Sequence, residues 1–420
     1  MTIVVTELPG PAGDQLERFL SDPEGALHEW RTFGGIVPVD LGGVETAIVY
    51  DLDAIHQQFA DKLENVGMAP VFARLGHATG TGILTNYDWA TWHPRRRTVV
   101  KPLGSRAVRQ FHERMVAIID DELDRFTVGD HADLMADVRR ITLRVIADLL
   151  FTTDLTPDAE AVIDRAVEAI HAWAEADPAN VDLDHEPPEF RAAISDLDRF
   201  IRSVIEGRSP AEPGGDMIGR LLTAREEGAA PLEGDAIRDE AVTLILAGHE
   251  TVTNTIAFAL DLSARHADAS ASPARHIVDE TLRIYPPVHI TNRLIVKDCQ
   301  LGDTLIPAGW ETIVPEIVLY RDEGLFERAD EFLPERWQEG SPLRMDRRAY
   351  FPFLTGPKFC VGSHFALLEA TEVVERFQAR FRLAMLDPEP PKGRFFALSY
   401  GPDRPMPYRL LAADRPELEN

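Results

Sequence analysis

The spacing of apolar positions predicts a chain that is mainly helical. Apolar residues recur at intervals of about 3.6 residues, the period of one helical face, through most of residues 90–285 and again over residues 361–381. Stretches rich in proline, glycine and polar residues interrupt the first run near residues 152–157, 177–188 and 208–215. We therefore expect a core of several helices, and one further helix near the carboxyl-terminal end.

A smaller β portion is predicted outside this helical core. β-Forming residues cluster at about 34–50, where two short runs flank a glycine-containing turn, at 286–318 and at 394–412. Residues 66–88 contain four glycines and are expected to form a long loop. No stretch has the composition of a linker, so we expect residues 1–420 to form a single α+β domain.

Composition and charge limit the class of protein. Hydrophobic residues make up 45% of the chain and charged residues 27%, which is typical of a globular protein with a large core. No stretch approaches the roughly 18 consecutive apolar residues of a membrane span, and residues 1–13 lack the features of a secretory signal. We therefore expect a cytoplasmic protein that does not enter a membrane. The 43 basic and 70 acidic residues give a net charge of −27, which repels phosphate backbones and excludes general nucleic-acid binding.

One basic segment interrupts this acidic character. Between Trp89 and His112 there are six basic residues and no acidic residue. Such a segment is typical of solvated surface. On so acidic a chain it also indicates contact with an anionic cofactor group or an acidic protein partner.

Cys360 is the first residue that could carry chemistry. The chain has only two cysteines, Cys299 and Cys360, which excludes a disulfide framework and any cysteine-rich metal site. Cys360 lies in a loop that runs directly into the helix predicted at 361–381, where the helix dipole and free N–H groups favour the thiolate that can bind a metal. A single cysteine near a helix start is also commonly an inert buried thiol. Taken alone, the residue leaves both interpretations open.

A helix predicted at about Asp239–Leu262 has a polar centre between apolar flanks. Gly248, Thr251 and Thr255 share one of its faces, and a glycine inside a helix costs roughly 1 kcal/mol relative to alanine. A large flat ligand pressed against this face would explain the glycine. The alternative is a polar stripe that faces solvent, against which the apolar flanks argue.

A third feature is a set of charged residues. Glu280 and Arg283 stand at i and i+3 of a predicted helix, and Arg336 lies in a proline-containing turn downstream. An isolated helix pair of this kind is usually surface decoration worth little free energy. The set is informative about function here only because other motifs accompany it.

Together these motifs resemble the cytochrome P-450 family of haem-thiolate monooxygenases, in the family's order and approximate spacing, over roughly residues 15–412. The cysteine loop resembles the family's Phe-x-x-Gly-x-x-x-Cys-x-Gly signature, carried by Phe353, Gly356, Cys360 and Gly362. The oxygen-binding segment and the three-residue charge network of the family are matched by Ala247, Gly248, Glu250, Thr251, Glu280, Arg283 and Arg336.

The resemblance implies a cytochrome P-450 fold with haem b (iron protoporphyrin IX) between the long central helix and the cysteine loop. Cys360 would ligate the iron as a thiolate, and the haem contacts would include Ala247, Phe353 and Gly356. It also implies three basic sites for the haem propionates. Arg293 fits one and Lys358 another, although the family usually has arginine or histidine at the position of Lys358.

The third propionate site lies in the basic segment, where the register is ambiguous. His93 with Arg97 matches the family's spacing and is the pair we favour. Trp92 with Arg96 fits the same four-residue interval.

In the family, the acid and the alcohol at the positions of Glu250 and Thr251 deliver protons during dioxygen activation. Glu280, Arg283 and Arg336 would stabilise the loop that carries the cysteine. Electrons would come from a separate ferredoxin and ferredoxin reductase. The ferredoxin would dock on segment 95–109 together with Lys358.

The resemblance suggests a mainly hydrophobic small-molecule substrate. Arginine outnumbers lysine 38 to 5, a bias of GC-rich bacterial genomes that makes secondary-metabolite tailoring the expected setting. Two alternatives are a peroxide-driven relative and a haem-binding helper without turnover. By position in the family, the substrate pocket would include Ile83, Leu84, Leu244, Ala247, Val288, His289, Ile290, Ala397 and Leu398, with a packed histidine as the alternative for His289.

Overall fold

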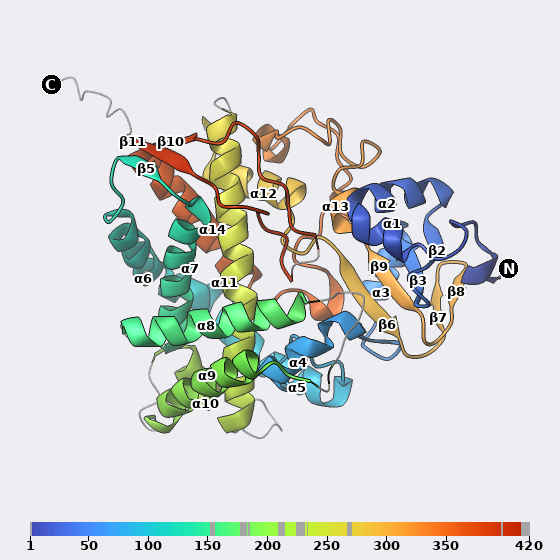
Figure 1. Ribbon diagram of the computed structural model, residues 1–420, viewed down its shortest axis with the longest axis horizontal. Helices are drawn as coiled ribbons and strands as arrows, with labels where there is room; N and C mark the ends of the chain where they lie inside the picture. The colour runs from blue at the N-terminus through green and yellow to red at the C-terminus, as the bar shows by residue number, and fades with distance from the viewer. Residues whose placement is uncertain are drawn as a thin grey trace.

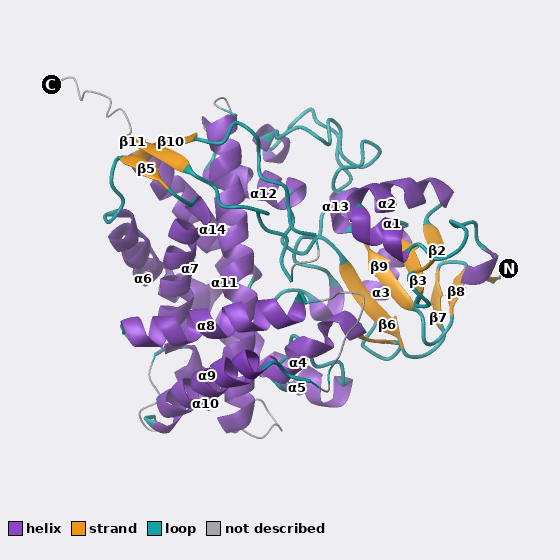
Figure 2. Ribbon diagram, in the orientation of Figure 1, coloured by secondary structure: helices purple, strands orange, loops and turns teal. Residues whose placement is uncertain are grey.

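Figure 1 shows the computed structural model, which describes residues 2–151, 156–176, 183, 185–208, 215–223, 232, 234–266, 271–395 and 398–412. Most helices gather in one part of the molecule, and the five-stranded sheet and the sheet of β1, β7 and β8 lie in another, as Figure 2 shows. The prediction of a mainly helical chain with a smaller β portion is confirmed. The loop prediction for residues 66–88 is wrong: this segment contains the strand β4 (Val66–Met68) and the helix α4 (Ala73–Thr79), whose Leu75 and Ala78 are buried.

The helical part is built around α11 (Gly234–Arg265), which is buried along most of its length. It packs against α7, α12 and α14, and Figure 1 shows it running through the middle of this part. None of the described helices is both long and apolar enough to cross a membrane. The other helices of this part are α5 (Trp89–Leu103), α6 (Ser105–Leu123), α7 (Leu134–Phe151), α8 (Pro157–Ala174), α9 (Pro188–Glu206), α10 (Met217–Thr223), α12 (Ala274–Ile284) and α14 (Ser363–Arg380).

The largest described sheet has the strand order β2-β3-β9-β6-β4. Its first two strands form an antiparallel hairpin in which Ile36 pairs with Val49, and Gly42 and Gly43 at the turn have positive φ angles of 70° and 86°. Strand β9 then pairs with β3 in parallel and with β6 antiparallel. The strands are β2 (Ile36–Asp40), β3 (Glu45–Val49), β6 (Thr291–Ile295) and β9 (Glu311–Val314), besides β4.

Two smaller sheets join segments that are distant in sequence. One has the order β1-β8-β7, and the other has the order β10-β11-β5 and lies beside the helices. Only the last residues of the 394–412 segment form a strand, and its partner β10 begins directly where α14 ends. The strands are β1 (Ile3–Val4), β5 (Gly129–His131), β7 (Cys299–Leu301), β8 (Thr304–Ile306), β10 (Phe381–Met385) and β11 (Tyr408–Ala412), and the remaining helices are α1 (Leu16–Ser21), α2 (Pro23–Trp30), α3 (Leu52–Phe59) and α13 (Glu316–Leu319).

The buried carboxylate of Glu280 on α12 accepts hydrogen bonds from its own helix and from the segment at residues 333–337. Glu280 accepts from Arg283 through Oε1 (2.7 Å) and Oε2 (3.0 Å), and from Nε of Arg336 (3.3 Å). The indole of Trp337 and the N–H of Leu333 also donate to it, at 2.9 and 3.1 Å. Glu280 and the two arginines are each at most 1% exposed, so their charges are satisfied inside the protein.

The same arginines hold main-chain carbonyls of the 320–331 segment. Arg283 donates to the carbonyl oxygens of Tyr320 (2.7 Å) and Ala329 (2.5 Å), and Arg336 donates to that of Glu327 (2.6 Å). The hydroxyl of Tyr320 in turn accepts from the N–H of Phe351 at 3.1 Å, just before the cysteine loop. The network therefore ties α12 to the chain that leads into the loop.

Replacing Glu280 should destabilise the fold strongly. In Glu280→Gln two buried guanidinium groups lose their counter-charge, for which we expect a loss of about 3–5 kcal/mol in the free energy of unfolding. Urea denaturation followed by far-UV circular dichroism measures it. The control is Glu331→Gln, which breaks an exposed pair with Arg328 and should change stability by less than about 1 kcal/mol. Equal effects of the two changes would contradict a structural role for Glu280.

Candidate functional site

The cysteine loop is a tight structure that depends on one glycine. Gly356 has a φ angle of 70°, and a Cβ atom there would collide with the carbonyl oxygen of Phe59 on α3. The N–H of Cys360 donates to the carbonyl of Phe353 at 2.9 Å, which closes the loop, and α14 begins three residues later at Ser363. The loop thus sits between α3 and the start of α14, with its cysteine just before the helix.

The thiol of Cys360 is accessible even though protein atoms surround it. This combination indicates open space next to the sulfur and dense protein behind it. Burial raises the pKa of the thiol, while the N–H groups of Gly362 and Ser363 and the guanidinium of Arg96 act to lower it. The N–H groups and the positive charge are what a thiolate would need, and a bound cation would complete the deprotonation.

α11 has a short accessible strip in its otherwise buried middle. Ala247 is exposed and Thr251 is half-buried, whereas Leu246, Val252 and the residues beyond them are buried. Thr251 Oγ1 donates to the carbonyl of Ala247 at 2.8 Å, so this hydroxyl stays against its own helix. An accessible strip inside a core helix indicates open space beside it.

The glycine of this helix has a packing explanation. A Cβ atom at Gly248 would lie 3.1 Å from Cδ1 of Ile146 on α7, which is tighter than ordinary contact. Gly248 therefore allows α7 to approach α11. Ala247 beside this face is exposed, and Gly248 and Thr251 on it are half-buried.

Arg293 on β6 is a buried guanidinium that lacks an acidic partner among the described residues. It is 1% exposed, it lies 4.8 Å from the ring centre of Phe59, and it donates to the carbonyl of Gln58 at 3.1 Å. Its Nε has no hydrogen-bond partner, and burial lowers its pKa. A buried charge of this kind is costly unless an anion meets it.

On α5 the structure places Trp92 and Arg96 against the cysteine loop. Trp92 is 1% exposed and donates to the carbonyl of Ile83 at 3.0 Å, and Arg96 lies over its ring and donates to the carbonyl of Phe359. Arg97 is exposed, and His93 stacks on Trp89 with ring centres 4.6 Å apart. These contacts favour the Trp92–Arg96 register over the His93–Arg97 register, a difference of one residue that turns a helical side chain by about 100°.

Lys358 points inward rather than toward a partner protein. Its ammonium donates to the carbonyls of Ile83 (3.1 Å), Leu84 (3.4 Å) and Asn86 (2.7 Å). Burial lowers its pKa to about 7. Three main-chain carbonyls thus hold the ammonium of Lys358, which argues against a place for it in a docking surface.

Two acids of α11 that the sequence did not single out bind the segment at residues 81–86, whose carbonyls accept from Lys358. Asp239 Oδ2 accepts from the N–H of Thr81 at 2.9 Å, and Glu240 Oε1 accepts from the N–H of Ile83 at 3.2 Å. Burial raises the pKa of Glu240 to about 7. Residues 81–86 are thus fixed through both their N–H and their C=O groups.

The predicted substrate residues divide into accessible and packed ones. Leu84 and Val288 are apolar and 40% and 36% exposed. Ala247 is also exposed, Ile290 and Leu398 are half-buried, Ile83 and Leu244 are buried, and Ala397 lies outside the described residues.

His289 is a packed residue. Its Nε2 contacts the carbonyl of Phe395, and the rings of Phe395 and Tyr400 lie 4.7 and 5.1 Å away. Burial lowers its pKa to about 4, so the ring is neutral at pH 7. The structure supports the packed alternative and not a pocket contact.

Glu250 is buried beside Thr251 and meets residues that no motif predicted. Its Oε2 lies 3.0 Å from Nε2 of His171 on α8, and its Oε1 lies 4.0 Å from Arg394. Burial raises the pKa of Glu250, although the positive charges of His171 and Arg394 act against it. A carboxyl group in this environment holds its proton more tightly than an exposed one.

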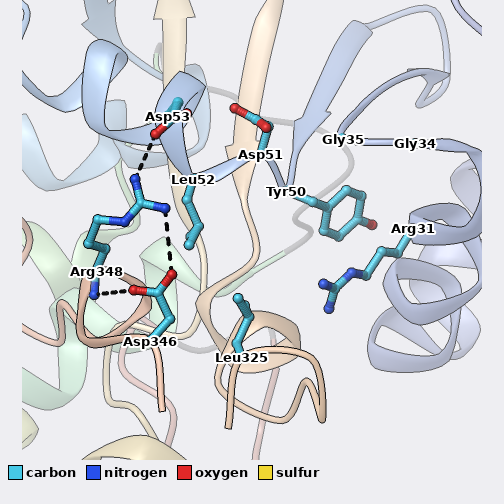
Figure 3. Close-up of a pocket in the computed structure, with 10 residues that line it drawn as sticks. All are labelled: Arg31, Gly34, Gly35, Tyr50, Asp51, Leu52, Asp53, Leu325, Asp346 and Arg348. Atoms are coloured by element: carbon cyan, nitrogen blue, oxygen red, sulfur yellow. Dashed lines mark hydrogen bonds and ion pairs between the residues drawn. The ribbon is translucent and has the colours of Figure 1, made fainter. Parts of the chain in front are cut away.

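A second concavity lies away from these residues, beside α3 (Figure 3). It has a volume of about 440 Å³, and charged side chains of both signs line it. Arg348 bridges Asp53 (2.8 Å) and Asp346 (3.5 Å), and Arg31 pairs with Asp322. Most charges of this concavity are therefore already engaged, and Asp51 caps the start of α3 by accepting from the N–H of Ala54 at 2.8 Å.

The residues around Cys360 fit a large, flat and anionic ligand bound through sulfur. The accessible thiol supplies the bond, the strip at Ala247 and Thr251 gives one surface, and Arg293 and Arg96 supply positive charge. Haem with its two propionates has these properties.

Comparisons with known proteins agree with this chemistry. The family described as Cytochrome P450 matches residues 27–272 and 274–405. Cyclooctatin synthase of Streptomyces melanosporofaciens is 28% identical over 348 residues, covering 75% of each chain. Pentalenene oxygenase of Streptomyces avermitilis is 24% identical, covering 91% of this chain and 92% of its own. The crystal structure of the cytochrome P450DA heme domain has the same fold, with a TM-score of 0.83 and 21% identity over 99% of this chain and 98% of that one.

Glu316 near Arg293 allows a pH test of the site's electrostatics. It is 1% exposed, Oε1 accepts from Thr291 at 2.5 Å, Oε2 has no partner, and burial raises its pKa from 4.5 to about 8. The folded protein therefore binds a proton that the unfolded chain releases. This contribution is complete below pH 4.5 and is lost as the pH rises through about 8.

Replacing Glu316 should consequently remove part of the pH dependence of stability. Glu316→Gln keeps the Thr291 hydrogen bond and cannot ionise, so we expect it to be more stable than the parent at pH 9 by on the order of 2–4 kcal/mol. Near pH 5 the two should be almost equally stable. Urea denaturation at pH 5, 7 and 9 measures the difference, with the exposed change Glu45→Gln as the control. A constant difference across this range would show that Glu316 is already ionised in the fold.

Proposed function

Because this chain belongs to the cytochrome P450 family of haem-thiolate monooxygenases, we propose that it inserts one atom of dioxygen into a mainly hydrophobic small molecule. The chain is an oxidoreductase that binds haem, as the family match implies. The observation that carries the proposal is the accessible thiol of Cys360, which lies directly before α14 with N–H groups and Arg96 beside its sulfur.

The haem would be held at one side by sulfur and at its edge by arginines. Cys360 would bind the iron as a thiolate, and Arg293 and Arg96 would meet the propionates. When bound, the haem supplies dioxygen activation and electron-transfer chemistry, which the thiolate ligand favours. Lys358 would contribute by fixing residues 83–86, since its ammonium is already bound there.

The distal residues would handle protons. Glu250 would hold a proton in its buried carboxyl group and release it toward Thr251, whose hydroxyl can turn from the Ala247 carbonyl to pass it on. The accessible face of Ala247 leaves room for the haem and substrate beside the helix. The carboxyl of Glu250 would thus act as a positioned acid whose proton affinity is raised by burial.

The substrate class follows from the apolar residues that remain accessible. Leu84 lies in the segment fixed by Lys358, and Val288 follows α12 just before β6. Exposed leucine and valine side chains favour contact with an apolar ligand. The two Streptomyces relatives support the tailoring of a secondary metabolite as the setting.

Electrons would come from a separate ferredoxin and its reductase. Arg106 and Arg109 are exposed near the start of α6, which follows α5 after a single glycine. An acidic ferredoxin would be attracted to this positive surface, which stands out on a chain with a net charge of −27.

The first test is the carbon monoxide difference spectrum of the dithionite-reduced protein. We expect the strongly red-shifted Soret band of thiolate ligation, and Cys360→Ala should lose it. Cys299→Ala, which changes a buried cysteine on β7, is the matched control and should keep it. A band at the shorter wavelength of imidazole or thiol ligation would contradict Cys360 as the ligand. Substrate-dependent NADPH consumption with a surrogate ferredoxin system then separates an enzyme from a haem-binding helper.

Charge reversal on α6 should weaken reduction by ferredoxin. In Arg106→Glu with Arg109→Glu we expect the reduction rate at low salt to fall by about tenfold, because electrostatic steering is lost. The rate should also become less sensitive to salt. Stopped-flow reduction under carbon monoxide measures both, and Arg199→Glu on α9 is the exposed control. Unchanged rate and salt dependence would place the docking surface elsewhere.

A further inference from the structure

The carboxyl group of Glu250 is the inner end of a continuous row of ionisable side chains. The ring of His171 lies between two acids: Nε2 is 3.0 Å from Oε2 of Glu250, and Nδ1 is 3.0 Å from Oε1 of Glu175. His171 and Glu175 belong to the carboxyl-terminal end of α8, which crosses α11 in Figure 1. One helix thus supplies both groups that lie outward of the buried acid.

The row continues to the surface. Glu175 Oε2 accepts from Nη1 of Arg394 at 3.3 Å, and its Oε1 also accepts from the N–H of Leu398 at 3.3 Å. The exposed fractions of the side chains rise from 10% at Glu250 to 13% at His171, 20% at Glu175 and 46% at Arg394. The side-chain exposure therefore increases at each step from Glu250 in the interior to Arg394 at the surface.

The two acids of the row differ in how tightly they hold a proton. Burial raises the pKa of Glu250, with Glu175 acting in the same direction and with His171, Arg394 and Arg139 of α7 acting against it. Burial also acts to raise the pKa of Glu175, but the bond from His171 and the charge of Arg394 outweigh it, and the net shift is downward. Glu250 therefore keeps a proton under conditions where Glu175 has lost its own.

We propose that His171 is a positioning residue that supplies protons to Glu250 from solvent and sets the charge of its carboxyl group. This inference rests on the proposed function, in which Glu250 is the distal acid. Nε2 lies 3.0 Å from Oε2 of Glu250 but makes no hydrogen bond in the structure, so the ring must first turn to point its Nε2–H at the carboxylate. The imidazolium then breaks its Nε2–H bond and the proton forms the O–H bond of Glu250, so one positive and one negative charge disappear together. The neutral ring, still held through Nδ1 by Glu175, regains its Nε2 proton from hydronium in solvent, and no electron changes hands.

Two features favour His171 over the other neighbours of Glu250. Arg394 lies 4.0 Å away and keeps its protons, because arginine does not deprotonate in proteins. His249 adjoins Glu250 in sequence but is 2% exposed, and burial lowers its pKa to about 4, so it remains neutral. Among these described groups, His171 alone combines close contact with Glu250, a partly exposed side chain and a ring that can carry a proton on either nitrogen.

The test is a pH titration of the Glu250 carboxyl band by difference infrared spectroscopy on the haem-loaded protein. The band is assigned by its loss in Glu250→Gln. In His171→Gln the midpoint should rise by about one pH unit, a tenfold change in proton affinity, because a neighbouring positive charge is gone. In Glu175→Gln it should move the opposite way, since a neighbouring negative charge is removed. The matched control His112→Gln changes another histidine–glutamate contact, that of His112 with Glu372 at 2.7 Å, and should leave the midpoint in place.

Measurements of turnover provide a second test of the role of His171. In His171→Gln, product formed per NADPH should fall about tenfold and the solvent deuterium isotope effect should rise, while the carbon monoxide spectrum stays as in the parent. Unchanged infrared midpoints in both His171→Gln and Glu175→Gln would overturn the role of His171. If His171→Gln does not fold, the shift in Glu175→Gln decides alone. A parent protein without haem turnover would instead count against the proposed function, because the infrared shifts do not depend on catalysis.

Discussion

The placement of the cysteine loop depends on the carboxylate of Glu280. Two guanidinium groups, an indole and a main-chain N–H converge on it in a region closed to water. Removing these charges from water is costly, and the arrangement is stable only because each is met by several hydrogen bonds. The arginines then hold the 320–331 carbonyls, and Tyr320 carries the constraint to Phe351 at the entrance of the loop. A network without chemistry of its own thus sets where the reactive sulfur lies.

The central helix faces a second constraint, since it must pack tightly and still leave space for a ligand. Gly248 lets α7 approach on one side, and that close packing anchors the helix. Ala247 and Thr251 remain accessible on the neighbouring side, where a larger apolar residue would fill the space. Glu250 points toward α8 rather than toward this opening. Neighbouring positions of one helix therefore differ in what they meet: Gly248 packs against α7, Ala247 and Thr251 remain accessible, and Glu250 contacts α8.

Charge is distributed in opposite ways at the surface and at the site. The chain as a whole carries a net charge of −27, yet Arg293 and Arg96 bring positive charge close to the cysteine loop. The ammonium of Lys358 donates to main-chain carbonyls of residues 83–86. It thereby joins the cysteine loop to the segment that carries Leu84. The loop that would meet the substrate and the loop that holds the sulfur are in this way mechanically connected. The same lysine cannot also serve a redox partner.

The sequence by itself determined the mainly helical fold, the cysteine loop, the acid–alcohol pair and the Glu280 network, because each depends on residue types at short fixed intervals. Local spacing could not distinguish Arg96 from Arg97, since adjacent residues on a helix point about 100° apart, and the contacts with Ile83 and Phe359 that favour Trp92 and Arg96 arise only in the tertiary structure. Nor could it show that His289 is packed or that Lys358 turns inward. The contact of His171 with Glu250 joins helices that are 79 residues apart in the chain. Only the tertiary structure decides such a pairing, because it arises from how α8 crosses α11 and leaves no periodic pattern in either segment.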